Sequence, residues 1–400
     1  MGNCCKKKKD DTLLDTEDPE KQIGNEDNPL GIKLKTDDFE KLKLIGKGSF
    51  GEVFLVKCKS NNKYYAMKVL DKQTIKKYNQ EEHTKSERDL MVKVECPFVV
   101  GIKFAFQDTA NLYLLTEFMQ GGELFFHLFR EKRFKNEKAR FYLTEIIIAI
   151  ETLHKNKMIY RDLKPENVLI DKEGHIRITD FGLSKILNKD KEKTFTICGT
   201  PQYLAPEILS CEGYDDSVDW WSLGCIMYKM LTGIDAFRFN KDESLSPDMY
   251  DQTLYFPDYI QKEAKDLIKK LLTKDPKKRL GSGSDGAEKI KNHKYFSDID
   301  WEKVKNKEYE PPFVPDLKGE IDLKYFDKGF TEERIDDYCE EEEPTSQNNE
   351  FKGFTYVTKS FPKNDIDYGR PSNDSNKDSN KDSNNDNNND NKNDSNNNKE

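Results

Sequence analysis

The sequence has 400 residues, with 66 Lys and Arg against 75 Asp and Glu and a formal net charge of -9. This balance gives no global cationic field and disfavours a nucleic-acid-binding protein. The eight cysteines form no CxxC pair, which favours a reducing, cytoplasmic compartment over a disulfide framework or a zinc site. No run approaches the roughly 18 apolar residues of a membrane helix, and the first residues are charged, so we expect neither secretion nor a membrane span.

Residues 1–38 are rich in Lys, Asp, Glu, Asn and Pro without apolar periodicity, which predicts a flexible arm. The arm starts MGNCCKKKK, so removal of Met1 exposes Gly2 to N-myristoylation. A myristoyl chain alone binds membranes only marginally, so we expect a second signal from palmitoylation of Cys4 and Cys5 and from the lysines that follow. We predict attachment to the cytoplasmic face of a membrane; the alternative is a charged, unmodified arm.

The folded part is expected to begin at Phe39, where aromatic and β-branched runs broken by Gly or Asn predict a small antiparallel β lobe. Residues 45–53 read IGKGSFGEV, which places Gly46, Gly48 and Gly51 in a G-x-G-x-x-G pattern. Dinucleotide-binding folds share this pattern, and the needs of a hairpin explain it about as well. Here, however, it continues as a strand, which suits a flap whose backbone amides cover phosphates.

Two charged residues that follow the glycine pattern form a second candidate unit. Lys68 lies in the apolar strand AMKV, where its stem would be buried, although a surface lysine is the simpler interpretation of this residue alone. Glu87 stands 19 residues later in a segment of helical composition. A Lys68–Glu87 pair would hold the lysine against the α- and β-phosphates of a nucleotide.

The second lobe is predicted to be larger and helical. In the segment RFYLTEIIIAIETLHKN, Leu143, Ile146, Ile147, Ile150 and Leu153 recur at helical spacing without Gly or Pro, which indicates a long buried helix. The fold class is therefore α+β.

The strongest chemical signal is in residues 159–170, IYRDLKPENVLI, and 178–183, ITDFGL. Asp162 would accept or orient the proton of an attacking hydroxyl, and Lys164 would offset charge on a transferred phosphoryl group. Asn167 and Asp180 would supply oxygen ligands to Mg2+. A chance match would need these residue types at this spacing between two apolar strands.

With APE at residues 205–207 and DWWSLG at 219–224, residues 39–296 resemble a protein kinase domain with its two-lobed fold. The motifs CGTPQYLAPE, IKNHKYF and FKGFTY resemble those of the AGC group, which includes protein kinase A and Akt. The resemblance implies a serine/threonine kinase that uses ATP and Mg2+. The alternative is a membrane-attached pseudokinase scaffold, which the presence of every phosphate, base and metal residue disfavours.

The resemblance also assigns the nucleotide site, with Thr116 as gatekeeper, residues 117–119 as the adenine hinge, and Val53, Ala66 and Leu169 as apolar walls. It implies a structural ion pair between Glu207 and Arg279. The ATP-binding residues expected are Ile45, Gly46, Lys47, Gly48, Ser49, Phe50, Gly51, Glu52, Val53, Ala66, Lys68, Glu87, Thr116, Glu117, Met119 and Leu169.

For substrates, the resemblance assigns Glu123 and Glu166 to read an arginine upstream of the acceptor. Lys229 and Gln202 stand where protein kinase A has glutamates, so we expect a strong requirement for Arg at position minus three and little at minus two. The expected partners are protein substrates with upstream Arg, an upstream activating kinase and a membrane surface, and no nucleic acid.

For regulation, the resemblance implies activation by phosphorylation of Thr196, with Arg161, Lys185 and His83 around it. Residues 297–362 resemble an AGC extension in which Phe351 and Phe354 dock beside the helix of Glu87. Within it, Ile335 replaces the Phe that usually reaches the ATP pocket. Residues 363–400 are Asn- and Asp-rich and are expected to be disordered. Further phosphorylation is expected at Thr355 and at Ser346 or the adjacent Thr345.

Overall fold

The computed structural model describes residues 27–28, 31–48, 51–187, 193–210, 212–238, 247–335 and 351–359. None of the helices in these ranges is long and apolar enough to cross a membrane. Several predictions fall outside the described residues, namely those for Gly2, Cys4, Cys5, Ser49, Phe50, Thr345, Ser346 and the tail 363–400.

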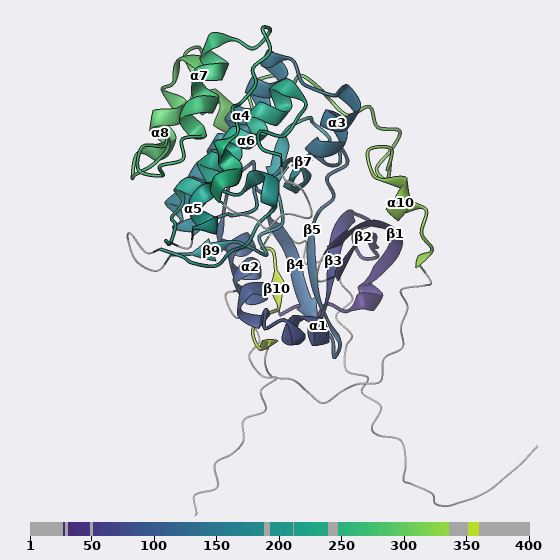
Figure 1. Ribbon diagram of the computed structural model, residues 1–400. Helices are drawn as coiled ribbons and strands as arrows, with labels where there is room; N and C mark the ends of the chain where they lie inside the picture. The colour runs from purple at the N-terminus through teal and green to yellow at the C-terminus, as the bar shows by residue number, and fades with distance from the viewer. Residues whose placement is uncertain are drawn as a thin grey trace, which may run out of the picture. The chain divides into compact units, whose positions relative to one another are not determined.

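The small lobe is built on one antiparallel sheet in the order β1-β2-β3-β5-β4-β10 (Figure 1). Five of its strands follow each other in the chain, but β10 comes from near the C-terminus and pairs with the free edge of β4. Helix α1 (Lys72–Lys77) and helix α2 (Glu81–Lys93) complete the lobe. The strands are β1 (Phe39–Gly48), β2 (Gly51–Cys58), β3 (Tyr64–Asp71), β4 (Ile102–Gln107), β5 (Asn111–Glu117) and β10 (Tyr356–Val357).

The glycine pattern joins β1 to β2 as a strand-turn-strand, as predicted. Gly48 and Gly51 face each other at the end of the β1–β2 register. A Cβ atom on Gly51 would lie 1.7 Å from the carbonyl oxygen of Val69 on β3, so no other residue fits there without moving the sheet. The glycine at this position is therefore required by the close approach of two strands.

The predicted boundary of the flexible arm is wrong for its last residues. Ile32 and Leu34 are buried, and a 3-10 helix at Thr36–Asp38 leads into β1. The side chain of Asn28 both accepts from the Ile32 amide (3.1 Å) and donates to the Ile32 carbonyl (2.9 Å). The polar composition of the whole arm concealed two alternating apolar residues, whose burial is enough to fix this short segment.

The large lobe is mainly helical, which confirms the two-lobed α+β prediction. The expected long helix is α4 (Asn136–Lys155), whose apolar face packs against α6 (Ser217–Thr232) in the core. Two short two-stranded antiparallel sheets, β6 (Met158–Ile159) with β9 (Lys185–Ile186) and the hairpin of β7 (Val168–Ile170) and β8 (Ile176–Ile178), carry the predicted catalytic segments. The other helices are α3 (Leu124–Glu131), α5 (Pro206–Leu209), α7 (Lys262–Leu271), α8 (Gly286–Lys291) and α9 (Trp301–Lys305).

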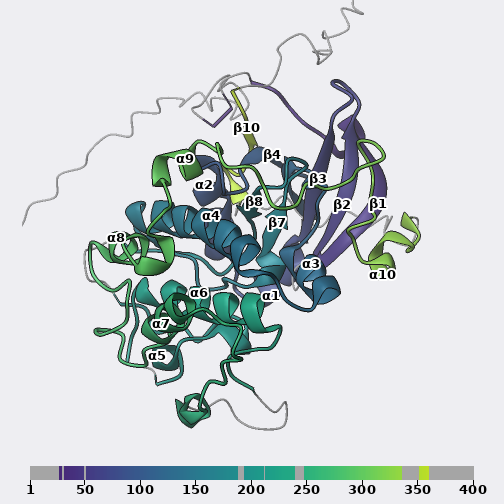
Figure 2. The ribbon, with the colours of Figure 1, turned by 90° about the horizontal axis from the view of Figure 1, so that it is seen from above.

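The C-terminal extension runs from the large lobe back to the small lobe. On the way, Gln120 donates to the Gly319 carbonyl (3.0 Å), and helix α10 (Lys328–Thr331) then contacts β1. Figure 2 shows α10 beside β1, and β10 beside β4 at the other end of the sheet. Both edges of the small-lobe sheet are thus covered by residues that follow the kinase-like segment.

Candidate active site

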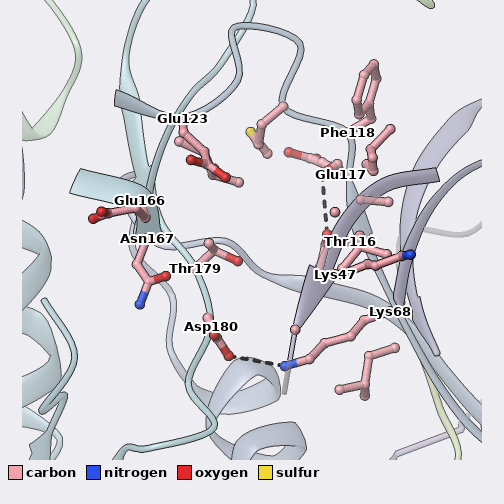
Figure 3. A pocket seen from close by; sticks show the side chains of 18 of the residues that line it. Lys47, Lys68, Thr116, Glu117, Phe118, Glu123, Glu166, Asn167, Thr179 and Asp180 are labelled. Carbon is pink, nitrogen blue, oxygen red and sulfur yellow. Dashed lines mark hydrogen bonds and ion pairs between the residues drawn. The ribbon is translucent and has the colours of Figure 1, made fainter. Parts of the chain in front are cut away.

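A cleft of about 240 Å³ lies between the sheet of the small lobe and the β7–β8 hairpin of the large lobe (Figure 3). Most predicted ATP-binding residues line it, and so do Glu123, Glu166, Asn167 and Asp180. Glu52 does not line the cleft, because side chains alternate along β2 and its neighbour Val53 takes the inner face. The predicted residues that line it are Ile45, Gly46, Lys47, Gly48, Gly51, Val53, Ala66, Lys68, Glu87, Thr116, Glu117, Met119 and Leu169.

Lys68 on β3 forms the predicted pair with Glu87 on α2, with 2.9 Å between Nζ and Oε1. A second carboxylate, that of Asp180, lies 3.1 Å from the same ammonium (Figure 3). Burial opposes the charge of Lys68, but Asp180 and Glu87 more than compensate and raise its pKa. Lys68 in turn lowers the pKa of Asp180, which keeps this carboxylate ionised. The cluster thus holds a charged lysine beside an acidic side chain that opens to the cleft.

The catalytic loop holds Asp162 in a network of three donors. Its Oδ2 accepts from Lys164 Nζ (2.7 Å) and Asn167 Nδ2 (2.9 Å), and its Oδ1 accepts from Thr200 Oγ1 (2.8 Å). Lys164 also donates to Thr200 Oγ1 (3.0 Å). The side-chain nitrogen of Asn167 is used by Asp162, so its oxygen is left as a ligand. The four residues therefore orient one another at the mouth of the cleft.

Asp219 on α6 accepts hydrogen bonds from the backbone of this loop, a role that the sequence did not reveal. Its side chain is fully buried and accepts from the backbone amides of Tyr160 (2.9 Å) and Arg161 (2.8 Å) and from His154 Nε2 (2.8 Å). Arg161 has a φ of +70°, which a side chain rarely adopts. The buried carboxylate offsets this strain and fixes the backbone just before Asp162.

The hinge end of the cleft contains an aromatic pair, of which the sequence predicted only the hinge member. Phe118 follows the hinge residue Glu117, and Phe326 of the C-terminal extension lies against it with ring centroids 5.4 Å apart. Ile335, the residue at the expected tail position, does not line the cleft, so Phe326 provides the aromatic wall instead. Phe118 belongs to the predicted hinge, and the lining residues missed from sequence are Met91, Leu114, Thr179 and Phe326.

A sequence profile of the protein kinase domain matches residues 39–296, which contain both lobes and the cleft. The chain belongs to the protein kinase family. A second profile, that of the protein kinase C terminal domain, matches residues 317–356. Kinases of the AGC group carry this second domain, and the relatives of this chain belong to that group. The resemblance seen in the sequence is therefore confirmed.

Several relatives are named as serine/threonine-protein kinases, and all of those described here are named as protein kinases. Protein kinase 2 of Dictyostelium discoideum is 45% identical over 351 residues, which cover 87% of this chain and 72% of that protein. Serine/threonine-protein kinase YPK2/YKR2 of Saccharomyces cerevisiae is 47% identical over 325 residues, 81% of this chain and 48% of that protein. Serine/threonine-protein kinase gad8 of Schizosaccharomyces pombe is 46% identical over 309 residues, 77% of this chain and 53% of that protein. This kinase therefore spans about half the length of the latter two.

Two acidic side chains of the kinase lie where the hinge meets the catalytic loop (Figure 3). Desolvation, with help from the neighbouring Glu166 and Asp327 carboxylates, raises the pKa of Glu123 to about 7. Glu123 is exposed to solvent at the surface of the cleft. Among the described residues, the buried Oε2 of Glu166 has no hydrogen-bond partner. This pair of carboxylates is therefore suited to receive a cation.

Thr196 lies in an activation segment whose backbone is hydrogen-bonded to the large lobe, but Thr196 itself is exposed. Tyr214 donates to the Thr196 carbonyl (2.6 Å) and accepts from Arg161 Nη1 (3.3 Å). Within the described ranges, no hydrogen bond links the Thr196 side chain to Arg161, Lys185 or His83. Lys185 reaches the buried Thr194 instead, at 3.3 Å.

Beyond the activation segment, the structure contains the predicted ion pair between Glu207 and Arg279. Arg279 donates to both carboxylate oxygens of Glu207, at 2.6 and 2.8 Å. The side chain of Arg279 is fully buried and that of Glu207 is 7% exposed. This bidentate pair anchors the end of the activation segment to the large lobe.

The docking of the C-terminal motif on the small lobe is confirmed. Phe351 and Phe354 are buried in the core, and Gln107 of β4 donates to the Phe351 carbonyl (2.9 Å). The ammonium of Lys85 on α2 lies 5.7 Å from the centroid of the Phe351 ring. Thr355 follows on the same segment and is partly exposed. The motif therefore packs against the helix that carries Glu87.

Proposed function

We propose that this kinase transfers the γ-phosphoryl group of ATP to serine or threonine hydroxyls of protein substrates. The observation that carries the proposal is the meeting of two ordered networks at one cleft: Lys68 with Glu87 and Asp180, and Asp162 with Lys164 and Thr200. The relatives named as serine/threonine-protein kinases, among them those of Saccharomyces cerevisiae and Schizosaccharomyces pombe, support it. A pseudokinase scaffold would not need these networks to be complete.

The residues of the cleft fit Mg2+ and the phosphates of ATP. Carboxylate and amide oxygens are the ligands that Mg2+ prefers, and Asp180 and the side-chain oxygen of Asn167 supply them. The Asp180 side chain is 49% exposed and therefore accessible from the cleft. When bound there, Mg2+ would neutralise charge on the phosphates. Lys68 would bind the α- and β-phosphates opposite it.

The reaction requires one bond to form and one to break. The substrate hydroxyl oxygen forms a bond to the γ-phosphorus while the bond to the β,γ-bridging oxygen breaks, and ADP leaves. Asp162 orients the hydroxyl and receives its proton, and Lys164 offsets the negative charge of the transferred group. Thr200 contacts both residues, which supports a site built for an alkyl hydroxyl of Ser or Thr.

We further propose that the substrates are basophilic. The Glu123 and Glu166 carboxylates would bind an arginine at position minus three, since an arginine fork matches carboxylates well. Lys229 already pairs with Asp235 (2.7 Å) and donates to the Tyr203 hydroxyl (3.1 Å). Because Lys229 puts a positive charge where protein kinase A has a glutamate, we expect weak selection for Arg at position minus two.

Activation is proposed to follow two phosphorylations. A phosphate on exposed Thr196 would add about -1.5 to -2 of charge near Arg161 and order the segment, and one on Thr355 would strengthen the docked motif. An upstream kinase would supply the phosphate on Thr196. A further site at Ser346 belongs to the same proposal.

We also propose the domain limits predicted from the sequence: a kinase domain at residues 39–296 and a C-terminal extension at 297–362. Myristoylated Gly2, with palmitoylated Cys4 and Cys5, would place this kinase at the cytoplasmic face of a membrane. The test is membrane fractionation of wild type against Gly2→Ala. Equal membrane recovery of the two would refute attachment.

The catalytic proposal is tested by phosphorylation of a peptide library with the purified full chain. The expected result is transfer to Ser or Thr with Arg at minus three, and Asp162→Asn serves as the inactive control. Transfer no faster than that control would refute the kinase activity. A preference for proline or acidic residues beside the acceptor would refute only the assignment of Glu123 and Glu166.

A further inference from the structure

The buried guanidinium of Arg88 on α2 is the meeting point of three separate parts of the chain. Arg88 is 7% exposed and directly follows Glu87, the residue that pairs with Lys68. Its Nη1 donates to Asp27 Oδ2 (2.9 Å), and its Nη2 donates to the Gly353 carbonyl (2.5 Å). One side chain thus binds α2 to a residue before the kinase domain and to the docked C-terminal motif.

Asp27 is bound to the C-terminal segment as well as to α2. Its backbone carbonyl accepts from the Val357 amide (2.9 Å), in the strand β10 that pairs with β4. The carboxylate of Asp27 is 38% exposed, whereas the arginine it neutralises is not. Asp89, on the same helix as Arg88, lies 3.1 Å from its Nε and gives part of the compensating charge. Asp27 is therefore the carboxylate that joins α2 to β10, rather than only a counter-charge.

From this arrangement we propose that Asp27 is a positioning residue for the Lys68–Glu87 pair. It fixes α2 against the docked motif, so the N-terminal segment is a working part of the phosphate-binding side of the cleft. The kinetic part of this proposal rests on the proposed kinase activity.

The experiment compares full-length Asp27→Lys with Asp37→Lys, which makes the same charge change at an exposed position of the same segment. The first readout is hydrogen exchange. Exchange of residues 351–359 and of α2 should rise about tenfold in Asp27→Lys, as expected for loss of a partly exposed charge-assisted hydrogen bond, and stay at the wild-type rate in Asp37→Lys. A rise spread equally over α4 and α6 would mean general unfolding and would overturn the proposal.

The second readout is kinetic. In Asp27→Lys we expect kcat/KM for ATP to decrease about fivefold, and in Asp27→Asn we expect a value between those of Asp27→Lys and wild type. Excess peptide of residues 351–359 should restore part of the kcat/KM that Asp27→Lys loses. Unchanged exchange and kinetics in Asp27→Lys, or equal effects in Asp37→Lys, would overturn the role of Asp27. If wild type itself phosphorylates no peptide, the proposed function fails, and the exchange data still decide whether Asp27 holds α2 to β10.

Discussion

The two sides of the cleft are held in place by different means. On the large-lobe side, Asp162 is fixed by neighbours in its own loop and by Asp219, in the core of the same lobe. On the small-lobe side, Lys68 depends on Glu87, whose helix is packed by residues from both ends of the described chain, Asp27 and Phe351. The difference teaches that the proposed base is held within its own lobe, whereas the proposed phosphate-binding lysine is placed by contacts from remote parts of the chain.

The strongest test of the built-in side is Asp162→Asn. It removes the proton acceptor but keeps the size of the side chain, so we expect kcat to fall by about 10²–10⁴. The measurement is steady-state phosphorylation of an Arg-containing peptide. Thermal unfolding should be close to wild type, and a variant that kept more than a tenth of wild-type kcat would show that Asp162 is not the base.

The ion pair between Glu207 and Arg279 tests whether the large lobe is held by its buried interior. Arg279→Ala would leave the Glu207 carboxylate buried without its partner, and we expect a loss of about 3–5 kcal/mol in the free energy of unfolding. Denaturant unfolding measures it. Lys270→Ala, which breaks the exposed pair with Asp266, is the control and should lose under about 1 kcal/mol.

The conditional side is tested by Phe351→Ala. The Phe351 side chain is fully buried, so its removal should weaken docking of the motif by about 3 kcal/mol and lower kcat/KM by at least about tenfold. Tyr259→Ala, at an aromatic residue that is 51% exposed, is the comparison. If Phe351→Ala lowered only the thermal stability and left the kinetics intact, the two sides of the cleft would be equally independent of the tail.

A pH experiment sharpens the comparison at the substrate end. Because the pKa of Glu123 is raised to about 7, its carboxylate gains a proton as the pH falls through that value, and the site loses an anion. The KM for a peptide with Arg at minus three should therefore rise several-fold between about pH 8 and pH 6. In Glu123→Gln the KM should be high at every pH. A profile of the same shape in wild type and variant would assign the titration to another group.

The smallest effect is expected at Lys47, in the glycine-rich strand, whose ammonium lies 2.8 Å from Glu333 of the C-terminal extension. Both side chains are partly exposed, so Glu333→Gln should change KM for ATP by no more than about fivefold, in line with an exposed ion pair. High salt should reduce the difference between the two proteins. A larger change would mean that the C-terminal extension affects ATP binding more strongly through the glycine-rich strand than through α2.

The sequence predicted the large-lobe side of the cleft more completely than the small-lobe side. Asp162 and Asn167 are close in sequence, so the resemblance of this one segment to a protein kinase motif assigned both to one site. Phe326 reaches the cleft from far along the chain, and nothing in its local sequence marks it as a wall beside Phe118. Asp27 was assigned to a flexible arm for the same reason, because its partners are remote. Remote contacts were predicted where the resemblance supplied a motif, as for Glu207 with Arg279 and for docked Phe351, and stayed hidden where it did not.

Strand β10 has a further consequence for the life of the protein in the cell. It contributes only two residues, yet it covers the outer edge of β4, where Val357 pairs with Phe104 and the Thr358 amide donates to Lys103. Chains whose motif has not docked would present an open, apolar sheet edge to other chains. Molecules with an undocked tail would then be the ones most inclined to aggregate. Docking of the tail would protect solubility as well as arrange the cleft.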